Sequence, residues 1–284
     1  MLCYVNGAWL PAEEARVSAF DRGFLFGDSV YEVIPLYAGR PFRLGAHLAR
    51  LRASLAAVGI REPGPEPPWE SVCARLGESV APQDGSLYLQ VSRGSAPRQH
   101  AFPRDAEPTV FAYARVREPE PAGAQTGLKA VLLDDIRWMR CDIKSTSLIA
   151  NVLLTQEAVV RGADEALLVR DGSVNEGAVS NVFAVRSGRL LTAPLSHLIL
   201  GGITRDVVLE LANAQGVPTE ERAIARDELL ACDEVLITSS TREVAAVTEI
   251  DGQAVGDGRP GAVFRRLHAA FQGFKDALRA GGDE

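Results

Sequence analysis

The stretch Asp134-Asp-Ile-Arg-Trp-Met-Arg-Cys-Asp-Ile-Lys144 stands between two segments with different patterns. Residues 128–133, which precede it, are mostly apolar and favour a strand. Residues 147–162, which follow it, favour a helix that ends at Gly162. The stretch itself has neither period. We therefore expect Lys144 in an irregular connection that leads into a helix.

Strands and helices do not alternate regularly on either side of this stretch, which predicts an α+β fold and disfavours a doubly wound nucleotide-binding sheet. Neither a G-x-G-x-x-G nor a G-x-x-x-x-G-K-[ST] motif is present. The patterns predict further strands at 29–37, 86–92, 109–116, 165–170, 182–185, 190–192 and 234–238, and further helices at 44–58, 69–80, 204–214 and 263–278.

Residues 117–127 are rich in Pro, Gly and Glu and have no hydrophobic period, as is typical of a linker. We therefore expect an N-terminal α+β domain at 1–117, an interdomain linker at 118–127 and a strand-rich C-terminal α+β domain at 128–284.

The composition excludes several classes of protein. A net charge of −7 argues against a nucleic-acid-binding surface. No apolar run is long enough to span a membrane, and the amino terminus lacks the features of a signal peptide. The four cysteines are scattered, which favours reduced thiols in a cytoplasmic protein, and the four separate histidines predict no metal site.

Lysine is scarce, with three residues against 27 arginines, so chemistry that needs a primary amine has few candidates. Lys129, on a strand, and Lys275, on the terminal helix, are expected to be solvated charges. Lys144 is the best candidate for bonding an aldehyde cofactor, although a surface position is the common alternative. Cationic neighbours such as Arg137 or Arg140 would lower the pKa of its amine.

Two glycine- or hydroxyl-rich turns are candidate anion sites. Leu198-Ile-Leu-Gly-Gly-Ile-Thr204 ends in a residue suited to cap the next helix, whose start favours a phosphate. Thr238-Ser-Ser-Thr241 follows an apolar strand, and Arg50 could supply a cation from the helix that carries His47. Each feature alone is more often an ordinary cap or turn.

Glu176 lies in a Gly-containing turn between two apolar strands. Most such glutamates are exposed. A buried one needs a cationic partner, for which a protonated pyridine nitrogen would serve.

Together these segments resemble the class IV pyridoxal-phosphate aminotransferases over nearly the whole chain. The resemblance is carried by Asp21-Arg-Gly-Phe-Leu-Phe-Gly-Asp-Ser-Val-Tyr-Glu32, His47-Leu-Ala-Arg50, Lys144, Glu176-Gly through Ser180-Asn-Val-Phe183, and Gly202-Ile-Thr-Arg205. It implies two α+β domains with pyridoxal 5'-phosphate at their interface, normally in a homodimer.

The resemblance also implies a role for each matching residue. Lys144 would bond the cofactor and move the substrate proton, and Glu176 would keep the pyridine nitrogen protonated. Leu200 would pack on the ring. The phosphate would be held by Arg50, Ile203, Thr204, Ser239 and Ser240.

Arg93-Gly-Ser-Ala-Pro-Arg-Gln-His-Ala-Phe-Pro103 is similar to the segment with which D-amino-acid transaminases bind the substrate carboxylate. By that resemblance Arg98, His100 and Tyr31 form a carboxylate trap, in their own subunit or across a dimer. Their guanidinium, imidazole and phenol groups can donate three hydrogen bonds. One departure is that Ala178 and Val179 replace a serine run of this branch, which affects the contacts around the cofactor and the side-chain preference.

These features predict a D-amino acid:2-oxo acid aminotransferase with D-alanine and D-glutamate as donors and pyruvate or 2-oxoglutarate as acceptors. The alternatives are a related class IV enzyme for branched-chain L-amino acids, an aminodeoxychorismate lyase, and a cofactor- or anion-binding module without turnover.

Overall fold

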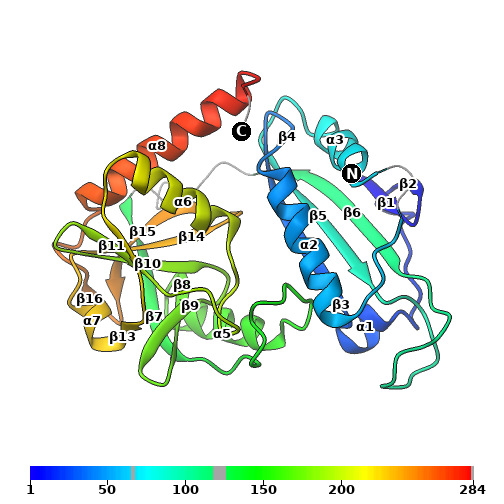
Figure 1. The fold of residues 1–284 in the computed structure, drawn as a ribbon, viewed down its shortest axis with the longest axis horizontal. Coiled ribbons are helices and arrows are strands. Elements are labelled where there is room, and N and C mark those ends of the chain that lie inside the picture. Colours follow the sequence, from blue (N-terminus) through cyan, green and yellow to red (C-terminus); the bar gives the residue numbers. More distant parts are fainter. Residues whose placement is uncertain (65–67, 118–125, 283–284) are drawn as a thin grey trace. The chain divides into compact units, whose positions relative to one another are not determined.

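In a computed structural model of the chain, the structure describes residues 1–64, 68–117 and 126–282. The chain divides into two compact units. The first comprises Met1–Glu118, Ile143–Leu148 and Asp276–Glu284, and the second comprises Pro119–Asp142 and Ile149–Lys275. Figure 1 shows the elements of each unit.

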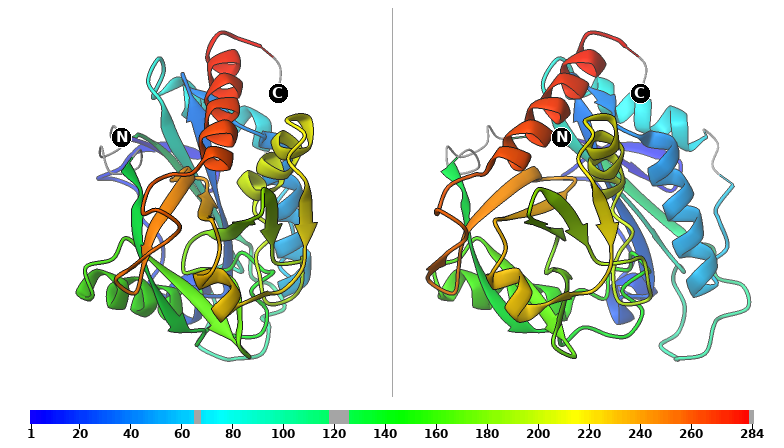
Figure 2. Two further views of the ribbon diagram at one scale, coloured as in Figure 1. Left: turned by 90° about the vertical axis from the view of Figure 1, so that its left-hand side faces the viewer. Right: turned by 60° about the vertical axis from the view of Figure 1, so that its left-hand side comes forward.

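The first unit is built on a six-stranded antiparallel sheet in the order β2-β1-β6-β5-β3-β4. Apolar side chains of α2 and α3 pack with those of the strands in one core, and the right-hand view of Figure 2 shows α2 running along the sheet. The elements are β1 (Leu2–Val5), β2 (Ala8–Pro11), α1 (Arg22–Phe26), β3 (Ser29–Tyr37), β4 (Arg40–Pro41), α2 (Leu44–Val58), α3 (Trp69–Glu78), β5 (Gly85–Ser92) and β6 (Thr109–Val116).

The second unit contains a ten-stranded sheet in the order β12-β11-β10-β14-β15-β7-β8-β9-β13, with β16 paired to β15. The inner strand β7 runs parallel to both its neighbours, β8 and β15. The elements are β7 (Leu128–Asp134), α5 (Ile149–Val160), β8 (Glu165–Arg170), β9 (Ser173–Gly177), β10 (Asn181–Arg186), β11 (Arg189–Thr192), α6 (Ile203–Ala214), β12 (Thr219–Glu221), β13 (Ile224–Ala225), α7 (Arg226–Leu230), β14 (Glu234–Ser239), β15 (Glu243–Ile250), β16 (Gln253–Ala254) and α8 (Ala262–Arg279).

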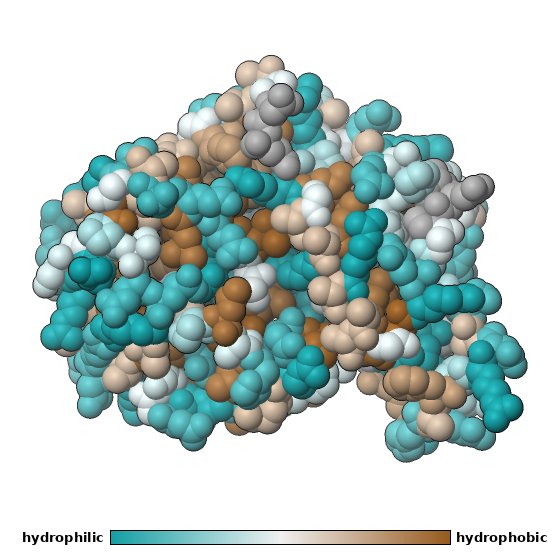
Figure 3. All heavy atoms as spheres, viewed as in Figure 1, coloured by the Kyte–Doolittle hydropathy of each residue, from teal (hydrophilic) through white to brown (hydrophobic). Residues whose placement is uncertain are grey.

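Successive side chains on the strands of this sheet point to opposite faces, so the sheet contributes to two hydrophobic cores. Val131 and Leu168 pack with Leu154 of α5, whereas Leu132 and Leu167 belong to the cluster on the other side of the sheet. On the face of the molecule shown in Figure 3, hydrophobic residues are interspersed with hydrophilic ones. Within the described ranges, the structure has no helix long and apolar enough to cross a membrane.

The predicted α+β class is confirmed, and every predicted strand and helix is present with bounds shifted by at most a few residues. The turn predicted around Glu176 is wrong, because this residue lies on β9, which pairs with β8 and β13. Thr204 is not a cap: α6 begins at Ile203 after the N-cap Gly202.

The units also differ from the expected domains at 1–117 and 128–284. Residues 143–148 belong to the first unit because Ser145 bridges Val30 and the carbonyl of Lys144 accepts a hydrogen bond from the amide of Tyr31. The last residues of α8 also belong to it. Of the predicted linker 118–127, residues 118–125 lie outside the described residues.

Candidate active site

Lys144 is fixed to the sheet of the first unit through its backbone. Its carbonyl accepts the amide hydrogen of Tyr31 on β3 at 3.0 Å, and its own amide donates to Ser54 Oγ on α2 at 3.3 Å. The side chain is half-buried, and Nζ lies 4.4 Å from the centre of the Tyr31 ring. The structure therefore places the candidate amine against one member of the predicted carboxylate trap.

A buried charge cluster lies next to Tyr31 in the sequence. Glu32 accepts two hydrogen bonds from Arg50, each 2.8 Å long, and one from His47 Nδ1 at 2.7 Å. Burial raises the pKa of Glu32, but the hydrogen bonds and charge of Arg50, followed by those of His47, bring it down to about 2. Glu32 is thus an anion that orients Arg50, the residue predicted to bind phosphate.

His47 is fully buried, and burial lowers the pKa of its imidazole against the opposing hydrogen bond and charge of Glu32. Its Nδ1 faces Glu32, and its Nε2 has no hydrogen-bond partner among the described residues. The charge of Lys144 is among the causes that lower the pKa of His47, so His47 and Lys144 belong to the same cluster.

Arg98 and His100 lie on an exposed loop and contact the ring of Phe26. In the described part of the chain neither makes a hydrogen bond or ring contact with Tyr31 or Lys144. The structure thus places Lys144 against Tyr31 and places both Arg98 and His100 against Phe26, but among the described residues it shows no contact between these two pairs.

Glu176 is buried in the second unit, where three groups donate to its carboxylate. They are the guanidinium of Arg137, the side-chain amide of Asn181 at 3.2 Å and the backbone amide of Leu200 at 3.1 Å. Burial raises the pKa of Glu176 to about 7, against the opposing effect of Arg137. A cation at this carboxylate would stabilise its ionised form, which suits a protonated pyridine nitrogen.

The cations expected to act on Lys144 are held by carboxylates. Arg137 binds Asp135 through two nitrogens, each at 2.9 Å, besides contacting Glu176, and Arg140 binds Asp142. The structure therefore shows Arg137 as a partner of Glu176, a role that the sequence analysis did not assign.

The start of α6 carries the predicted phosphate-binding residues. Ile203 and Thr204 are its first two residues and are buried, and amides in the first turn of a helix have no intrahelical acceptor. Asn181 donates to the carbonyl of Leu200 at 2.8 Å as well as to Glu176, which links this turn to the carboxylate.

The second hydroxyl turn is at the end of β14. Ser239 Oγ accepts the amide hydrogen of Arg242 at 3.0 Å, and Ser240 follows it in the turn. Thr238 Oγ1 is buried without a hydrogen-bond partner among the described residues. Amides at the start of α6 and hydroxyls at this turn fit a phosphate, as Glu176 fits a ring nitrogen and Lys144 fits an aldehyde.

The departure from the serine run leaves one hydroxyl in place. Ala178 is buried, Val179 is exposed, and Ser180 donates to the buried carboxylate of Glu165 at 3.0 Å. Burial raises the pKa of Glu165, so Ser180 partners an acid that is easily protonated. Glu165 and Asn181 are residues that the sequence analysis missed. The only feature of the sequence that could have indicated them is a polar side chain at the start of an apolar strand.

Known proteins resemble this chain at the level of sequence and of fold. The family model for class IV aminotransferases matches residues 29–250. The chain is 45% identical over 268 residues to a D-alanine aminotransferase of Bacillus licheniformis, and the match covers 94% of each protein.

Two solved structures have the same fold. A branched-chain aminotransferase of Thermoproteus uzoniensis, solved with norvaline, matches with a TM-score of 0.87 and 27% identity, covering 100% of this chain and 96% of that one. A hypothetical aminotransferase of Mycobacterium tuberculosis, solved in its PLP-bound form, has a TM-score of 0.81 and 26% identity, with coverage of 95% and 98%. The matching family model, the sequence relative and the shared fold lead to one conclusion: the chain belongs to the class IV aminotransferases.

Proposed function

We propose that this protein is a pyridoxal 5'-phosphate-dependent D-amino acid:2-oxo acid aminotransferase. D-Alanine and D-glutamate are its donors, and pyruvate and 2-oxoglutarate are its acceptors. The observation that carries the proposal is the buried Glu176, held by Arg137 and Asn181, in a chain with a single lysine suited to bond an aldehyde. The 45% identity to a D-alanine aminotransferase supports the choice of substrate.

Each predicted site residue has a specific role toward the bound cofactor. Pyridoxal phosphate supplies an aldehyde and an electron-accepting ring. Lys144 Nζ would hold the cofactor through its aldehyde carbon. Once the substrate amine has taken its place on that carbon, the released Lys144 amine would accept the proton from the substrate Cα, as a general base. The Glu176 carboxylate would hold a proton on the ring nitrogen, and Leu200 would pack on the ring. The phosphate would be held by Arg50, Ser239, Ser240 and the first turn of α6, which contains Ile203 and Thr204.

Stereochemistry depends on where the substrate carboxylate is bound. The proposed carboxylate trap consists of the phenol of Tyr31, the guanidinium of Arg98 and the imidazole of His100. Each group can donate hydrogen bonds to the substrate carboxylate, and together they can fix its orientation. By the family resemblance, a substrate carboxylate bound by these three groups would leave the Cα–H bond of a D-amino acid facing Lys144.

The proposal is tested by incubating the purified holoenzyme with D- or L-alanine and 2-oxoglutarate. We expect pyruvate and glutamate from the D-isomer. Pyruvate from L-alanine alone, or activity confined to L-leucine, would favour an enzyme of branched-chain type. Pyruvate released from aminodeoxychorismate without an acceptor would indicate a lyase. No turnover of any donor would indicate a binding module.

We also propose that the protein forms a homodimer. Exposed apolar side chains on α5 would be removed from water by a second copy, and they are Ile149, Val152, Leu153, Val159 and Val160. Light scattering should give twice the 30.4 kDa mass of one chain. A mass of one chain, unchanged over the working range of concentration, would contradict it.

We also propose that the protein is located in the cytoplasm. All four cysteines are buried and unpaired, and burial raises the pKa of Cys141 and of Cys232 to about 11. Free thiols fit a reducing compartment. Fractionation of the native host should recover the activity with cytoplasmic markers. Recovery with membrane or secreted fractions would contradict this location.

A further inference from the structure

The loop that carries Arg98 and His100 needs an external support. Both side chains are exposed, and residues 96–103 form neither helix nor strand. Recognition of a carboxylate requires donors in a fixed geometry, because each group that must be ordered on binding reduces the affinity. The structure supplies that support through two residues of α1, Arg22 and Phe26.

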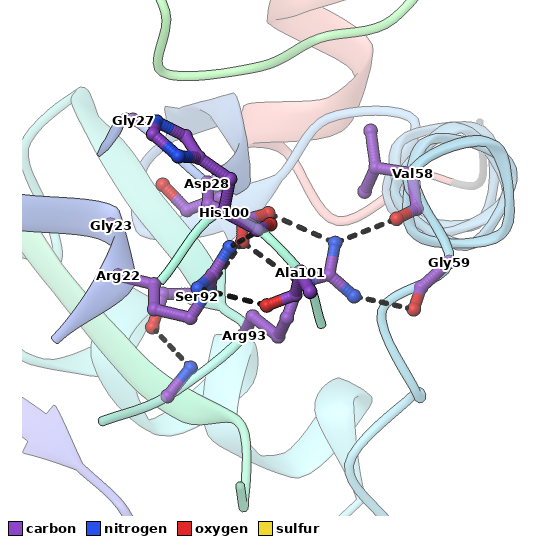
Figure 4. Close-up of polar contacts among 12 residues, drawn as sticks. Arg22, Gly23, Gly27, Asp28, Val58, Gly59, Ser92, Arg93, His100 and Ala101 are labelled. Atoms are coloured by element: carbon purple, nitrogen blue, oxygen red, sulfur yellow. Dashed lines mark hydrogen bonds and ion pairs between the residues drawn. The ribbon is translucent and has the colours of Figure 1, made fainter. Parts of the chain in front are cut away.

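Arg22, the first residue of α1, is buried and holds three consecutive carbonyls of the loop (Figure 4). Its guanidinium donates to Gln99 O at 2.5 Å and to His100 O at 3.3 Å, and it reaches Ala101 O at 3.5 Å. One planar, five-donor group thus fixes the backbone at and beside His100.

Asp28 holds Arg22 in place and joins it to a second buried arginine. Its carboxylate accepts from Arg22 Nε at 2.7 Å and from Arg93 at 2.8 and 2.9 Å. Burial raises the pKa of Asp28, but hydrogen bonds from Arg93 and Arg22 bring it below its usual value, so it remains an anion. Arg93 also donates to the carbonyls of Val58 and Gly59 at the end of α2, both at 2.7 Å.

Phe26, the last residue of α1, supports the two side chains directly. The guanidinium carbon of Arg98 lies 5.2 Å from the centre of its ring, and the ring of His100 lies 5.4 Å away. Arg22 packs on the same ring at 4.8 Å. Cation–π and ring contacts of this kind restrict the positions that both side chains can adopt.

We propose that Arg22 and Phe26 are positioning residues that fix Arg98 and His100 to bind the substrate's α-carboxylate. The inference rests on the proposed function. Neither residue touches the substrate: Arg22 acts on the loop backbone, and Phe26 acts on the side chains. Asp28 and Arg93 complete the support by fixing Arg22 to α2.

The test compares Arg22→Lys with the wild-type holoenzyme in steady-state assays. Lysine keeps the charge that faces Asp28 but cannot span three carbonyls. We expect KM for D-alanine and for 2-oxoglutarate to rise about 10- to 100-fold, because small displacements of binding groups have effects of this size. The value of kcat and the absorption band of the cofactor should stay close to those of the wild type. Arg104→Lys, an exposed change on the same loop, is the matched control.

A double-mutant cycle separates positioning from general structural support. In an Arg98→Met background, Arg22→Lys should raise KM by a factor at least about threefold smaller than in the wild type, because the residue that it positions is gone. Phe26→Leu keeps every ion pair of the support and should raise KM in the same sense. If Arg22→Lys does not fold, Phe26→Leu is the variant that tests the inference.

Unchanged KM values in Arg22→Lys and Phe26→Leu, or fully additive effects in the cycle, would overturn the inference. Loss of the cofactor band together with kcat would also overturn it, since it would show a structural role only. A wild-type enzyme that turns over no D-amino acid is a different result. It refutes the proposed function before any variant is compared, and this inference falls with it.

Discussion

At the scale of single residues, the three lysines have different surroundings. Lys129 is exposed and pairs with Glu249, and Lys275 is buried against Glu243 at 2.7 Å, whereas Lys144 lies over the ring of Tyr31. Two of the three amines are therefore engaged by a carboxylate. The remaining one, Lys144, is the amine that the family resemblance implies for bonding the cofactor.

Replacement of this lysine should abolish covalent attachment of the cofactor. Borohydride reduction of the wild-type holoenzyme should remove its visible absorption and leave a modified peptide that contains Lys144. Lys144→Ala should show neither the modification nor transamination, and Lys129→Ala, the matched control, should show both. A Lys144→Ala variant with wild-type activity would refute the assignment.

A second prediction concerns the charge of Glu176. Arg137 lowers the pKa of this carboxyl from an even higher value to about 7, so the ligand-free protein binds a proton there below that pH. In Arg137→Gln the pKa should rise by roughly 1–3 units, which is the usual effect of an adjacent charge. Glu176 then remains neutral to higher pH and binds a protonated ring nitrogen poorly.

The measurement is the affinity of the apoprotein for pyridoxal phosphate between pH 5 and 9. In the variant, the rise in affinity that accompanies ionisation of Glu176 should move to higher pH. Arg140→Gln removes an arginine three residues away that is bound to Asp142 instead, and its profile should match the wild type. Identical profiles for all three proteins would refute the role of Arg137.

At the scale of elements, apolar periodicity predicted most of the longer strands and helices of both units, but not β15 or short elements such as β12 and β13. It missed β9 because the buried side chains of this strand are Val174 and Glu176, so its alternation includes a charge. Lys275 was wrongly expected to be exposed. It is four residues after Phe271 and three before Leu278, on the buried stripe of α8, and its partner Glu243 lies on another element.

The buried pair formed by Lys275 should stabilise the fold more than an exposed pair does. Lys275→Met leaves the Glu243 carboxylate buried without its ammonium partner and should lower the free energy of unfolding by about 3–5 kcal/mol. Lys129→Met, which breaks the exposed pair with Glu249, should change it by less than about 1 kcal/mol. Urea denaturation of both variants checks the difference, and equal effects would contradict it.

The turn before α6 requires a glycine because Asn181 approaches it closely. A Cβ atom at Gly202 would lie 2.0 Å from Asn181 Oδ1, whereas one at Gly201 would have its nearest neighbour 3.7 Å away. Gly202→Ala should displace Asn181 from Glu176 and Leu200. We expect a loss of about 1–3 kcal/mol in stability, as for other overpacked sites, and weaker binding of the cofactor.

Thermal denaturation and cofactor titration of Gly202→Ala and the control Gly201→Ala check this prediction. The control should resemble the wild type in both measurements. If Gly202→Ala did so as well, the link between Asn181 and the start of α6 would have no functional importance.

At the scale of the whole molecule, the sequence predicts the chemistry of the candidate site in more detail than its geometry. Lys144, Glu176 and the start of α6 could be singled out because lysine is rare, a buried acid needs a partner and a helix start favours anions. Residues that act through tertiary contacts could not. Arg137 reaches Glu176 and Arg22 reaches Gln99 across many residues of chain, and no local pattern encodes such pairs.

The central claim is that Lys144 moves the Cα proton of a D-amino acid. The most direct measurement is rapid mixing of the holoenzyme with D- or L-alanine without an acceptor, while the absorption of the cofactor is followed. We predict a single rapid turnover to pyruvate and the aminated cofactor with D-alanine, little change with L-alanine, and no turnover with either isomer in Lys144→Ala. Rapid turnover of L-alanine alone, or of D-alanine in Lys144→Ala, would contradict the account.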